Sequence, residues 1–493
     1  MERIEHAVLP DQDPRQDHIA RVTGHLMSRR AAIAAGLGGG SALFAGLALQ
    51  GRVAGAQPGP PTTGATATTT SIASPTSIAS PTSAVPGTTA VPGSLPGPPL
   101  PPNQAGGVNV RDFGATGNGT TDDGPAVQRA INAAQSTKAG LVIFPPGTYL
   151  VNETLQAQAP IRIVGLGGWS STTLVFSPSL ATGLSVTSGG NYPGSGIEIA
   201  GLQFEYGGSG NAVYLSGGYP NTLVQGCRFY LSGTGNGTGL YTTGQHDDMI
   251  TQCQFYGSST TVGSGIALND TDNAKIIDNV FYKLGYGVYG IRGANRVDDA
   301  GCLLVSNSMY GFTDAFHFEG WELVQAIGNI VDGAFSRCFY LQDCYHSIIA
   351  ENYLGINGTD YGLLIETRQP YGVGFLGQLT VRGNYLNHYE GTSGSPAIGV
   401  VGASATLPED QVTIEGNILN GYPNSGGIYL HNAQNVMVSM NTLNRAASSP
   451  AGVVSILDDT PGHNYILNNL VDAPVQAQGD YVQNNFTRIA YPT

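Results

Sequence analysis

The chain has 493 residues, of which 41% are hydrophobic and 11% are charged, and it contains 71 Gly and 29 Pro. So little charge with so many turn residues argues against a helical architecture and favours short strands joined by tight turns. The net charge of −14 argues against nucleic acid or an anionic membrane surface as a partner.

The first 56 residues have the features of an export signal. Paired arginines, Arg29 and Arg30, precede an Ala/Gly/Leu-rich run from Ala31 to Leu49, and a small-x-small site ends at Ala56. This pattern resembles a twin-arginine signal, although the usual Phe-Leu pair is missing after the arginines. The alternative is a permanent membrane anchor, which the glycines of the run disfavour. We expect an exported bacterial protein, extracellular or at the cell surface, without an integral membrane domain after cleavage.

Residues 57–106 consist mainly of Pro, Thr, Ser, Ala and Gly, and they include no charged side chain. Such a segment cannot bury a hydrophobic core. We therefore predict a disordered linker here, followed by a folded domain over residues 107–493.

A repeat of 22 to 33 residues runs through residues 107–493. Four phenylalanines, Phe204, Phe229, Phe255 and Phe281, recur every 25 or 26 residues. Short strands with Gly and Asn turns at this period predict a β-solenoid. Asparagines continue the register and are predicted to form a hydrogen-bonded ladder along the solenoid axis: Asn279, Asn307, Asn329, Asn352, Asn384, Asn417, Asn441, Asn469 and Asn485.

The five cysteines show neither a disulfide-scaffold pattern nor a C-x-x-C metal spacing. Cys227 and Cys253 occupy the asparagine column one coil apart. They are predicted to be small apolar fillers, with a disulfide as the alternative. The spacing of the cysteines gives no reason to expect a zinc site.

The start of the repeat region carries a family resemblance. The segment V-N-V-R-D-F-G-A-T-G-N-G-T-T-D-D-G-P-A-V-Q-R-A-I-N-A-A, Val108 to Ala134, is followed by G-L-V-I-F-P-P-G-T-Y-L-V. It resembles the N-terminal signature of the pectate-lyase superfamily, which includes polygalacturonases, rhamnogalacturonases, glucanases, alginate epimerases and lyases, and phage tailspikes. The resemblance implies an all-β fold, a right-handed parallel β-helix with an N-terminal capping α-helix, but it says little about function.

The residues of this segment also support a capping helix directly. Ala126, Val127, Ala130, Ile131 and Ala134 form an apolar stripe at helical spacing. Asp122 and Asp123 precede it, and we interpret them as helix caps although they look like a catalytic acid pair.

Two family motifs do not fit as they stand. The polygalacturonase set of N-T-D, D-D, G-H-G and R-I-K has only superficial echoes in Asp247-Asp248 and Asn269-Asp270. The alginate epimerase motif Y-G-F-D-P-H begins like Tyr310-Gly311-Phe312, but His317 lies two residues too late.

Aligning the coils with one another predicts an outward stripe on the second strand of each coil. Its third position runs Tyr241, Ala267, Tyr289, His317, Tyr340, Leu364, Gly399 and Tyr429. Its fifth position runs Thr243, Asn269, Ile291, Glu319, Gln342, Glu366, Val401 and His431. Both positions face outward together because strand side chains alternate with a period of two.

The stripe suggests a site for a sugar polymer, since flat aromatic rings bordered by acids and amides suit sugar rings. We assign Glu319 as general acid of a glycoside hydrolase, with Glu366 or Asp343 as base. Two coils place the backbones of Glu319 and Glu366 roughly 9–10 Å apart, near the separation of an inverting pair. The substrate-binding candidates are Tyr289, His317, Tyr340 and Gln342, with Arg292, Arg337 and Arg368 for a uronate carboxylate; Trp321 either walls the groove or packs beneath a loop.

Three other interpretations remain open. A polysaccharide lyase or epimerase would use Arg, Tyr or His to remove the C5 proton, with the carboxylates or a calcium ion neutralising the uronate. The Asp- and Arg-containing turns around 270–272 and 292–299, with Arg292, Arg296, Asp298 and Asp299, would then matter, although solvated loop charge explains them equally. A non-catalytic adhesin or carbohydrate-binding solenoid is the second interpretation, and for the stripe itself a plain solvated surface is the third. A cofactor is expected in none of these cases except for calcium in a lyase.

Overall fold

The computed structural model describes residues 106–136, 140–188, 196–218, 221–233, 235–292, 299–358, 360–368, 377–389, 394–422, 425–446, 453–460, 463–478 and 480–487. The predicted export signal and almost all of the predicted linker, residues 1–105, lie outside these ranges. Within the described residues, no helix is long and apolar enough to cross a membrane.

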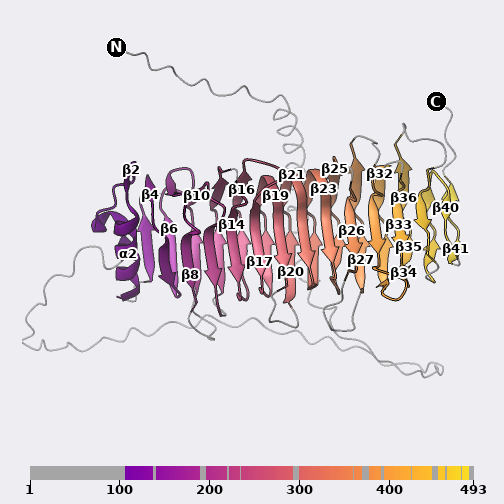
Figure 1. Cartoon of the computed structure of the whole chain (residues 1–493), viewed down its shortest axis with the longest axis horizontal. Helices are drawn as coiled ribbons and strands as arrows, with labels where there is room; N and C mark the ends of the chain where they lie inside the picture. Colours follow the sequence, from indigo (N-terminus) through magenta and orange to yellow (C-terminus); the bar gives the residue numbers. More distant parts are fainter. Residues whose placement is uncertain are drawn as a thin grey trace, which may run out of the picture. The chain divides into compact units, whose positions relative to one another are not determined.

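Strands of successive coils stack in parallel along one axis and build a right-handed β-solenoid (Figure 1). The predicted fold class is therefore confirmed. A 15-stranded sheet, here called sheet A, receives one strand from each coil: β1 (Val108–Asn109), β3 (Leu141–Phe144), β6 (Ile161–Gly165), β9 (Ile197–Ala200), β12 (Thr222–Gln225), β15 (Met249–Thr251), β18 (Ala274–Ile277), β20 (Asp299–Val305), β22 (Trp321–Ile327), β24 (Ile348–Ala350), β27 (Leu379–Arg382), β31 (Val412–Glu415), β35 (Met437–Ser439), β38 (Tyr465–Leu467) and β41 (Tyr481–Gln483).

The remaining strands of the coils form a 25-stranded sheet, here called sheet B, which has two arms. The first arm contains β2 (Asn118–Asp122), β4 (Gly147–Val151), β7 (Thr172–Phe176), β10 (Gln203–Tyr206), β13 (Arg228–Leu231), β16 (Gln254–Gly257), β25 (Tyr353–Ile356), β28 (Tyr385–His388), β32 (Ile418–Tyr422), β36 (Thr442–Arg445), β39 (Leu470–Val471) and β42 (Phe486–Thr487). The second arm contains β5 (Leu155–Gln158), β8 (Thr182–Thr187), β11 (Asn211–Ser216), β14 (Thr238–Thr243), β17 (Ser264–Asn269), β26 (Leu363–Glu366), β29 (Ile398–Val401), β33 (Ile428–His431), β37 (Ile456–Asp458) and β40 (Val475–Gln476).

Three long strands in the middle of the solenoid run through both arms: β19 (Val280–Ile291), β21 (Ser308–Glu319) and β23 (Ile330–Gln342). Their first halves pair with strands of the first arm and their second halves with strands of the second arm. The backbone therefore stays hydrogen-bonded through the bend between the arms, which fixes the side chains on either side of it. A small third sheet pairs β30 (Glu409–Asp410) with β34 (Ala433–Gln434).

The N-terminal end is covered by the helix that the sequence predicts. A short 3-10 helix, η1 (Val110–Phe113), precedes α2 (Gly124–Ser136), whose buried face contains the five predicted apolar residues. Asp123 binds the turn at residues 116–117 through its carboxylate, accepting from the N–H groups of Thr116 at 2.6 Å and Gly117 at 2.9 Å. Asp122 accepts from the N–H of Gly124 at 3.1 Å. Asp122 thus contacts the first residue of α2, as predicted for a cap, whereas the Asp123 carboxylate binds the neighbouring turn instead of the helix.

Two internal ladders confirm the repeat register. The rings of Phe204, Phe229, Phe255 and Phe281 stack with centroids 4.7–5.1 Å apart. In the asparagine ladder, the Nδ2 of each member donates to the Oδ1 of the next at 2.9–3.1 Å, from Asn279 to Asn485. Cys227 and Cys253 are buried free thiols in this column.

Candidate functional site

The strand register brings the predicted stripe residues into one column, in which His317 is 6% and Tyr340 3% exposed. Tyr289 pairs with His317 and His317 with Tyr340, while Glu319 pairs with Gln342 and Gln342 with Glu366. We call these six residues, on β19, β21, β23 and β26, the His317 stripe. Two strand steps, about 9–10 Å, separate the backbones of Glu319 and Glu366.

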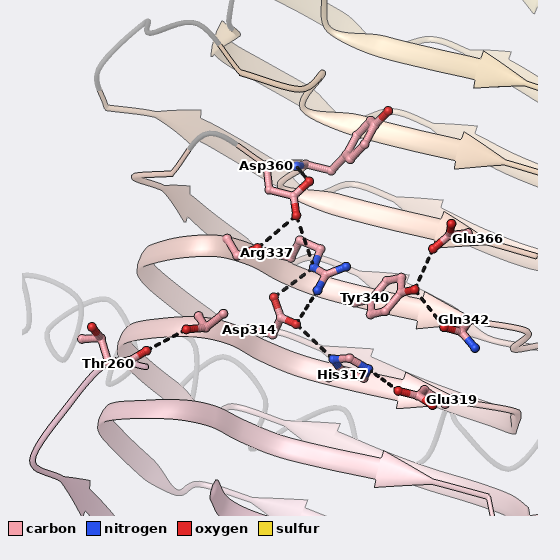
Figure 2. A network of polar contacts seen from close by, with 12 residues as sticks. Thr260, Asp314, His317, Glu319, Arg337, Tyr340, Gln342, Asp360 and Glu366 are labelled. Carbon is pink, nitrogen blue, oxygen red and sulfur yellow. Dashed lines mark hydrogen bonds and ion pairs between the residues drawn. The ribbon is translucent and has the colours of Figure 1, made fainter. Parts of the chain in front are cut away.

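Asp314 holds the His317 ring from the inner side of the site (Figure 2). Its Oδ2 lies 3.0 Å from His317 Nδ1, and the Asp314 side chain is 1% exposed. Arg337 donates to both oxygens of Asp314, from Nε at 2.9 Å and from Nη2 at 2.8 Å. Such a bidentate pair fixes the carboxylate, and the carboxylate in turn fixes the ring.

A bend in β21 explains why Asp314 and His317, three residues apart, meet. Strict alternation would put them on opposite faces of a strand. Ala315 and Phe316 are consecutive and both fully buried, which marks the passage from the first arm to the second. A register irregularity between β21 and β23 lies beside it, where Asp314 comes opposite Arg337. Sequence reasoning missed Asp314 for this reason, and two successive apolar residues before His317 were the available signal.

Glu319 contacts the other side of the imidazole. Its Oε1 lies 2.8 Å from His317 Nε2, so both ring nitrogens face a carboxylate. Burial works against charge on His317, but the contacts with Asp314 and Glu319 outweigh it and raise the pKa of the imidazole. The bond from His317 lowers the pKa of Glu319, against a smaller opposing effect of burial. Burial would raise the pKa of Asp314, but His317 and Arg337 together hold that pKa below its ordinary value.

These pKa directions do not fit one predicted role. A general acid needs a raised pKa so that it carries a proton at working pH. Glu319 has the opposite shift. It therefore fits a base, or a partner of His317, better than the acid of a hydrolase.

Tyr340 connects the two halves of the stripe. Its hydroxyl donates to Glu366 Oε2 at 2.6 Å, and Arg368 Nε lies 3.0 Å from the same oxygen. Burial and the bond to Glu366 raise the pKa of the Tyr340 phenol far above its ordinary value, so it stays protonated. The Arg337 guanidinium lies 3.9 Å from the centroid of the Tyr340 ring.

Aromatic rings enclose the imidazole. The centroid of His317 lies 5.0 Å from that of Tyr289 and 4.6 Å from that of Tyr340, both edge to face. Tyr286, which the sequence reasoning did not select, adds a third edge contact at 5.4 Å. These contacts restrict the ring to one orientation and leave its Nε2 directed along the stripe toward Glu319.

The other predicted residues lie around this centre in different ways. Asp343 is 4% exposed and accepts from the backbone N–H of Arg368 at 2.9 Å, so it supports the turn after β26. Arg368 is the most accessible cation of the group, with 59% of its side chain exposed. Arg292 follows β19, and its backbone N–H donates to the carbonyl of Glu319 at 3.1 Å.

Of the two positions predicted for Trp321, the structure excludes a wall of the groove, and the ring packs inside the solenoid instead of beneath a loop. It is fully buried and packs edge to face on Phe318 at 5.4 Å, so it lines the interior of the solenoid. The first residue of β22 points inward in this coil, which the sequence pattern alone did not reveal.

Among the residues that the structure describes, no group of three or more His, Cys, Asp or Glu is arranged to hold a metal ion. Of the Asp- and Arg-rich turns proposed for a calcium-dependent lyase, Arg296 and Asp298 lie outside the described ranges. Within them, Asp272 Oδ2 lies 2.8 Å from His246 Nδ1.

Comparisons with known proteins agree on the architecture. A family model described as "Rhamnogalacturonase A/epimerase, pectate lyase-like" matches residues 107–321. The catalytic unit of a thermostable GH87 alpha-1,3-glucanase from Streptomyces thermodiastaticus has a similar structure, with a TM-score of 0.51 and 16% identity over 73% of this chain and 69% of that one. The first match supports the pectate-lyase-like superfamily, and the second concerns the fold alone.

Sequence relatives match a short segment. Mannuronan C5-epimerase AlgE3 of Azotobacter vinelandii is 49% identical over 71 residues, which cover 13% of this chain and 4% of that protein. A probable glucan endo-1,3-beta-glucosidase of Arthroderma benhamiae is 39% identical over 66 residues, 12% of this chain and 8% of that protein. The chain thus spans a small fraction of the length of these relatives.

Proposed function

We propose that the protein is an exported carbohydrate-active enzyme that acts on a polysaccharide at the His317 stripe. We further propose that its reaction is abstraction of the C5 proton of a uronate residue, as in a lyase or an epimerase. The observation that carries this proposal is the Arg337–Asp314–His317 arrangement (Figure 2). Relatives named as an epimerase and a glucanase support polysaccharides as the substrate class.

In this mechanism His317 is the base. Asp314 accepts the Nδ1–H, so the ring becomes a base only when it loses the Nε2 proton that it shares with Glu319, and the Nε2–Glu319 contact then has to open to admit the substrate. The proton on C5 moves to Nε2, and the electron pair stays on C5, where the adjacent carboxylate group delocalises it. The exposed Arg368 guanidinium is available to pair with that carboxylate.

Tyr340 is the proton donor that completes the reaction. Its phenol is protonated, and its ring lies 4.6 Å from that of His317. In a lyase, the bond from C4 to the glycosidic oxygen breaks as the C4–C5 double bond forms, and Tyr340 protonates the departing oxygen. In an epimerase, Tyr340 instead delivers a proton to the opposite face of C5.

Inverting glycoside hydrolysis remains the second candidate, and the register favours it. Glu319 and Glu366 lie two strands apart with Gln342 between them. Their backbone separation of about 9–10 Å is close to the 6.5–9.5 Å that separates the two carboxyl groups of an inverting pair. Because the pKa of Glu319 is lowered, Glu319 would then act as the base and Glu366 as the acid, the reverse of the sequence-based assignment.

The test uses the purified full chain and its His317→Gln, Glu319→Gln and Glu366→Gln variants. Polymannuronate, polygalacturonate and a neutral 1,3-glucan are incubated in deuterated buffer, and ultraviolet-absorbing unsaturated ends, reducing ends and deuterium at C5 are measured. We expect unsaturated ends or C5 deuterium, lowered about 10²- to 10⁴-fold in His317→Gln. The matched control is His346→Gln, a histidine that pairs with Glu322 at 2.8 Å on the sheet A side.

Each contrary result has a definite meaning. Reducing ends without unsaturation or exchange, lost in both glutamate variants, would replace proton abstraction with hydrolysis. Polysaccharide binding without any product would contradict both reactions and favour the adhesin.

A further inference from the structure

A second column of aromatic and polar side chains runs along the outer face of the first arm of sheet B. Tyr230, Tyr256, Tyr282 and Tyr310 pair in register on four consecutive strands, β13, β16, β19 and β21. Asp332 on β23 pairs with Tyr310 and follows in the same column. The tyrosines thus repeat once per strand step, about every 4.8 Å.

The column continues past Asp332 with a ring supplied from another position. Gly355 occupies the next coil, and the Tyr389 ring covers it so closely that an added Cβ would lie 2.8 Å from the ring. The Tyr389 hydroxyl donates to Asp332 Oδ1 at 2.8 Å. Glycine is therefore needed at 355 to seat an aromatic ring on the column.

Amides complete the column toward the C-terminus. Asn387, Asn420 and Asn444 pair in register on β28, β32 and β36, and Asn444 Nδ2 donates to Asn420 Oδ1 at 2.7 Å. We call the whole column the tyrosine–asparagine strip: Tyr230, Tyr256, Tyr282, Tyr310, Asp332, Tyr389, Asn387, Asn420 and Asn444. From β13 to β36 it covers eight strand steps, about 38 Å.

Cations flank the tyrosine half of the strip. The Arg228 guanidinium lies 5.2 Å from the centroid of the Trp169 ring and 4.5 Å from that of Tyr256. The Lys283 ammonium lies 5.1 Å from the centroid of the Tyr282 ring. The same column holds two carboxylates, Asp332 and Glu205, which pairs in register with Tyr230, so the attraction for an acidic ligand is confined to the positions of Tyr256 and Tyr282 beside these two cations.

The strip differs from the ladders that hold the solenoid together. The phenylalanine ladder and the inner asparagine ladder are almost completely buried, whereas Tyr230 is 39% and Tyr389 46% exposed, and Tyr256, Tyr282 and Tyr310 between them are partly exposed. Exposed rings contribute less to the core than buried ones, so packing alone does not account for a row of them. Aromatic side chains that stay at least partly exposed along a continuous row are typical of a binding surface.

We propose that the tyrosine–asparagine strip is a second, non-catalytic binding surface for an acidic polysaccharide. The polymer would lie along the solenoid axis, with the apolar faces of its sugars on the tyrosines and its hydroxyls on the amides and Asp332. Arg228 and Lys283 would pair with its carboxylates. Only the choice of a uronate polymer rests on the proposed function; the binding surface itself does not.

The tyrosine–asparagine strip lies on the same central strands as the His317 stripe. β19 carries Tyr282 of the strip and Tyr289 of the His317 stripe, and β21 carries Tyr310 and His317 in the same way. A polymer held on the first arm therefore stays beside the second arm, which raises the concentration of chain segments at the stripe without adding any contact there.

The test measures binding separately from turnover. Retardation of the His317→Gln protein in native gels containing polymannuronate or polygalacturonate is compared with that of a protein that also carries Tyr256→Ala and Tyr282→Ala. We expect the affinity to fall about tenfold or more. The matched control replaces Tyr465 and Tyr481, an exposed tyrosine pair on sheet A with centroids 6.0 Å apart, and should bind as before.

A second variant guards against misfolding. Asn420→Ala with Asn444→Ala alters the amide half of the strip and should weaken binding while the unfolding temperature stays close to that of the parent. Unchanged binding in both strip variants would overturn the proposal and leave a structural ladder. Binding lost instead through Tyr289→Ala with Tyr340→Ala would overturn it too, by placing the polymer on the His317 stripe alone. A wild-type chain that binds through the strip but turns over no polysaccharide would support the strip and refute the proposed function.

Discussion

The inner asparagine ladder and the outer His317 stripe are both polar columns that cross the same central coils. In the ladder, one residue type repeats in nine coils and each amide bonds to the next. In the stripe, the residue changes at nearly every coil, and its bonds connect unlike partners such as His317 with Glu319 and Tyr340 with Glu366. A repeated side chain satisfies a need that every coil has, whereas a varied column concentrates different groups at one place.

Breaking the ladder tests the first half of this comparison. Asn329→Ala removes the donor to the Leu304 carbonyl and the acceptor of the Asn307 N–H, both buried. Each orphaned buried group costs roughly 1–3 kcal/mol, so we expect the two to lower the free energy of unfolding by about 2–6 kcal/mol, as measured by denaturant titration. Specific activity per folded molecule should change little.

The loss of stability in Asn329→Ala should also be local. Neighbouring coils in a solenoid stabilise each other mainly pairwise, so hydrogen exchange should rise first around residues 304–330. A stable Asn329→Ala protein with lost activity would show that the ladder serves the site, and the contrast between the two columns would fail. His317→Gln, which leaves the ladder intact, is the matched control.

Asp248 provides a contrast with the asparagine ladder, because it is a buried polar residue that is not a member of that ladder. It is fully buried, and burial, with the charge of Asp247 as a lesser cause, raises its pKa to about 7. A raised folded-state pKa means that the folded protein binds more protons than the unfolded chain, so wild-type stability falls as the pH rises from about 4 to about 7. We expect Asp248→Asn to gain relative to the wild type over this interval, by at most about 4 kcal/mol, and to keep a constant advantage above it.

The measurement is the unfolding temperature of both proteins from pH 4 to pH 8.5. The control is Asp278→Asn, an exposed carboxylate in a left-handed conformation that Asn tolerates well. A constant difference between wild type and Asp248→Asn at every pH would contradict the account, because it would remove protonation as the cause.

Repetition also explains how much of the molecule could be predicted. The Phe and Asn spacings predicted the solenoid, the ladder and the register of the stripe, because each coil repeats the same geometric requirement. The bend at Ala315–Phe316 has no such repeat, so Asp314 was missed and Trp321 was not resolved between its two predicted positions. The role of Glu319 depended on a neighbour two residues away, since His317 reverses the pKa shift that a general acid needs. What is specific to one coil was therefore the part that the sequence did not predict.

The smallest expected effect concerns the pH profile of the stripe. If His317 is the base, activity is low while the imidazole is protonated and rises through its raised pKa, so the acid limb of kcat/KM should lie above the ordinary value of about 6.5. Glu319→Gln removes one of the two carboxylates that raise this pKa. The acid limb should therefore move to lower pH, with a change of less than about tenfold at the plateau. Glu322→Gln, which affects the partner of His346 on the sheet A side, should leave the limb in place.

In an inverting hydrolase Glu319→Gln would instead abolish activity at every pH, because the carboxylate itself would activate the water. A shifted acid limb with a retained plateau would therefore identify Glu319 as a residue that raises the pKa of His317. A lost plateau would identify Glu319 as a catalytic residue.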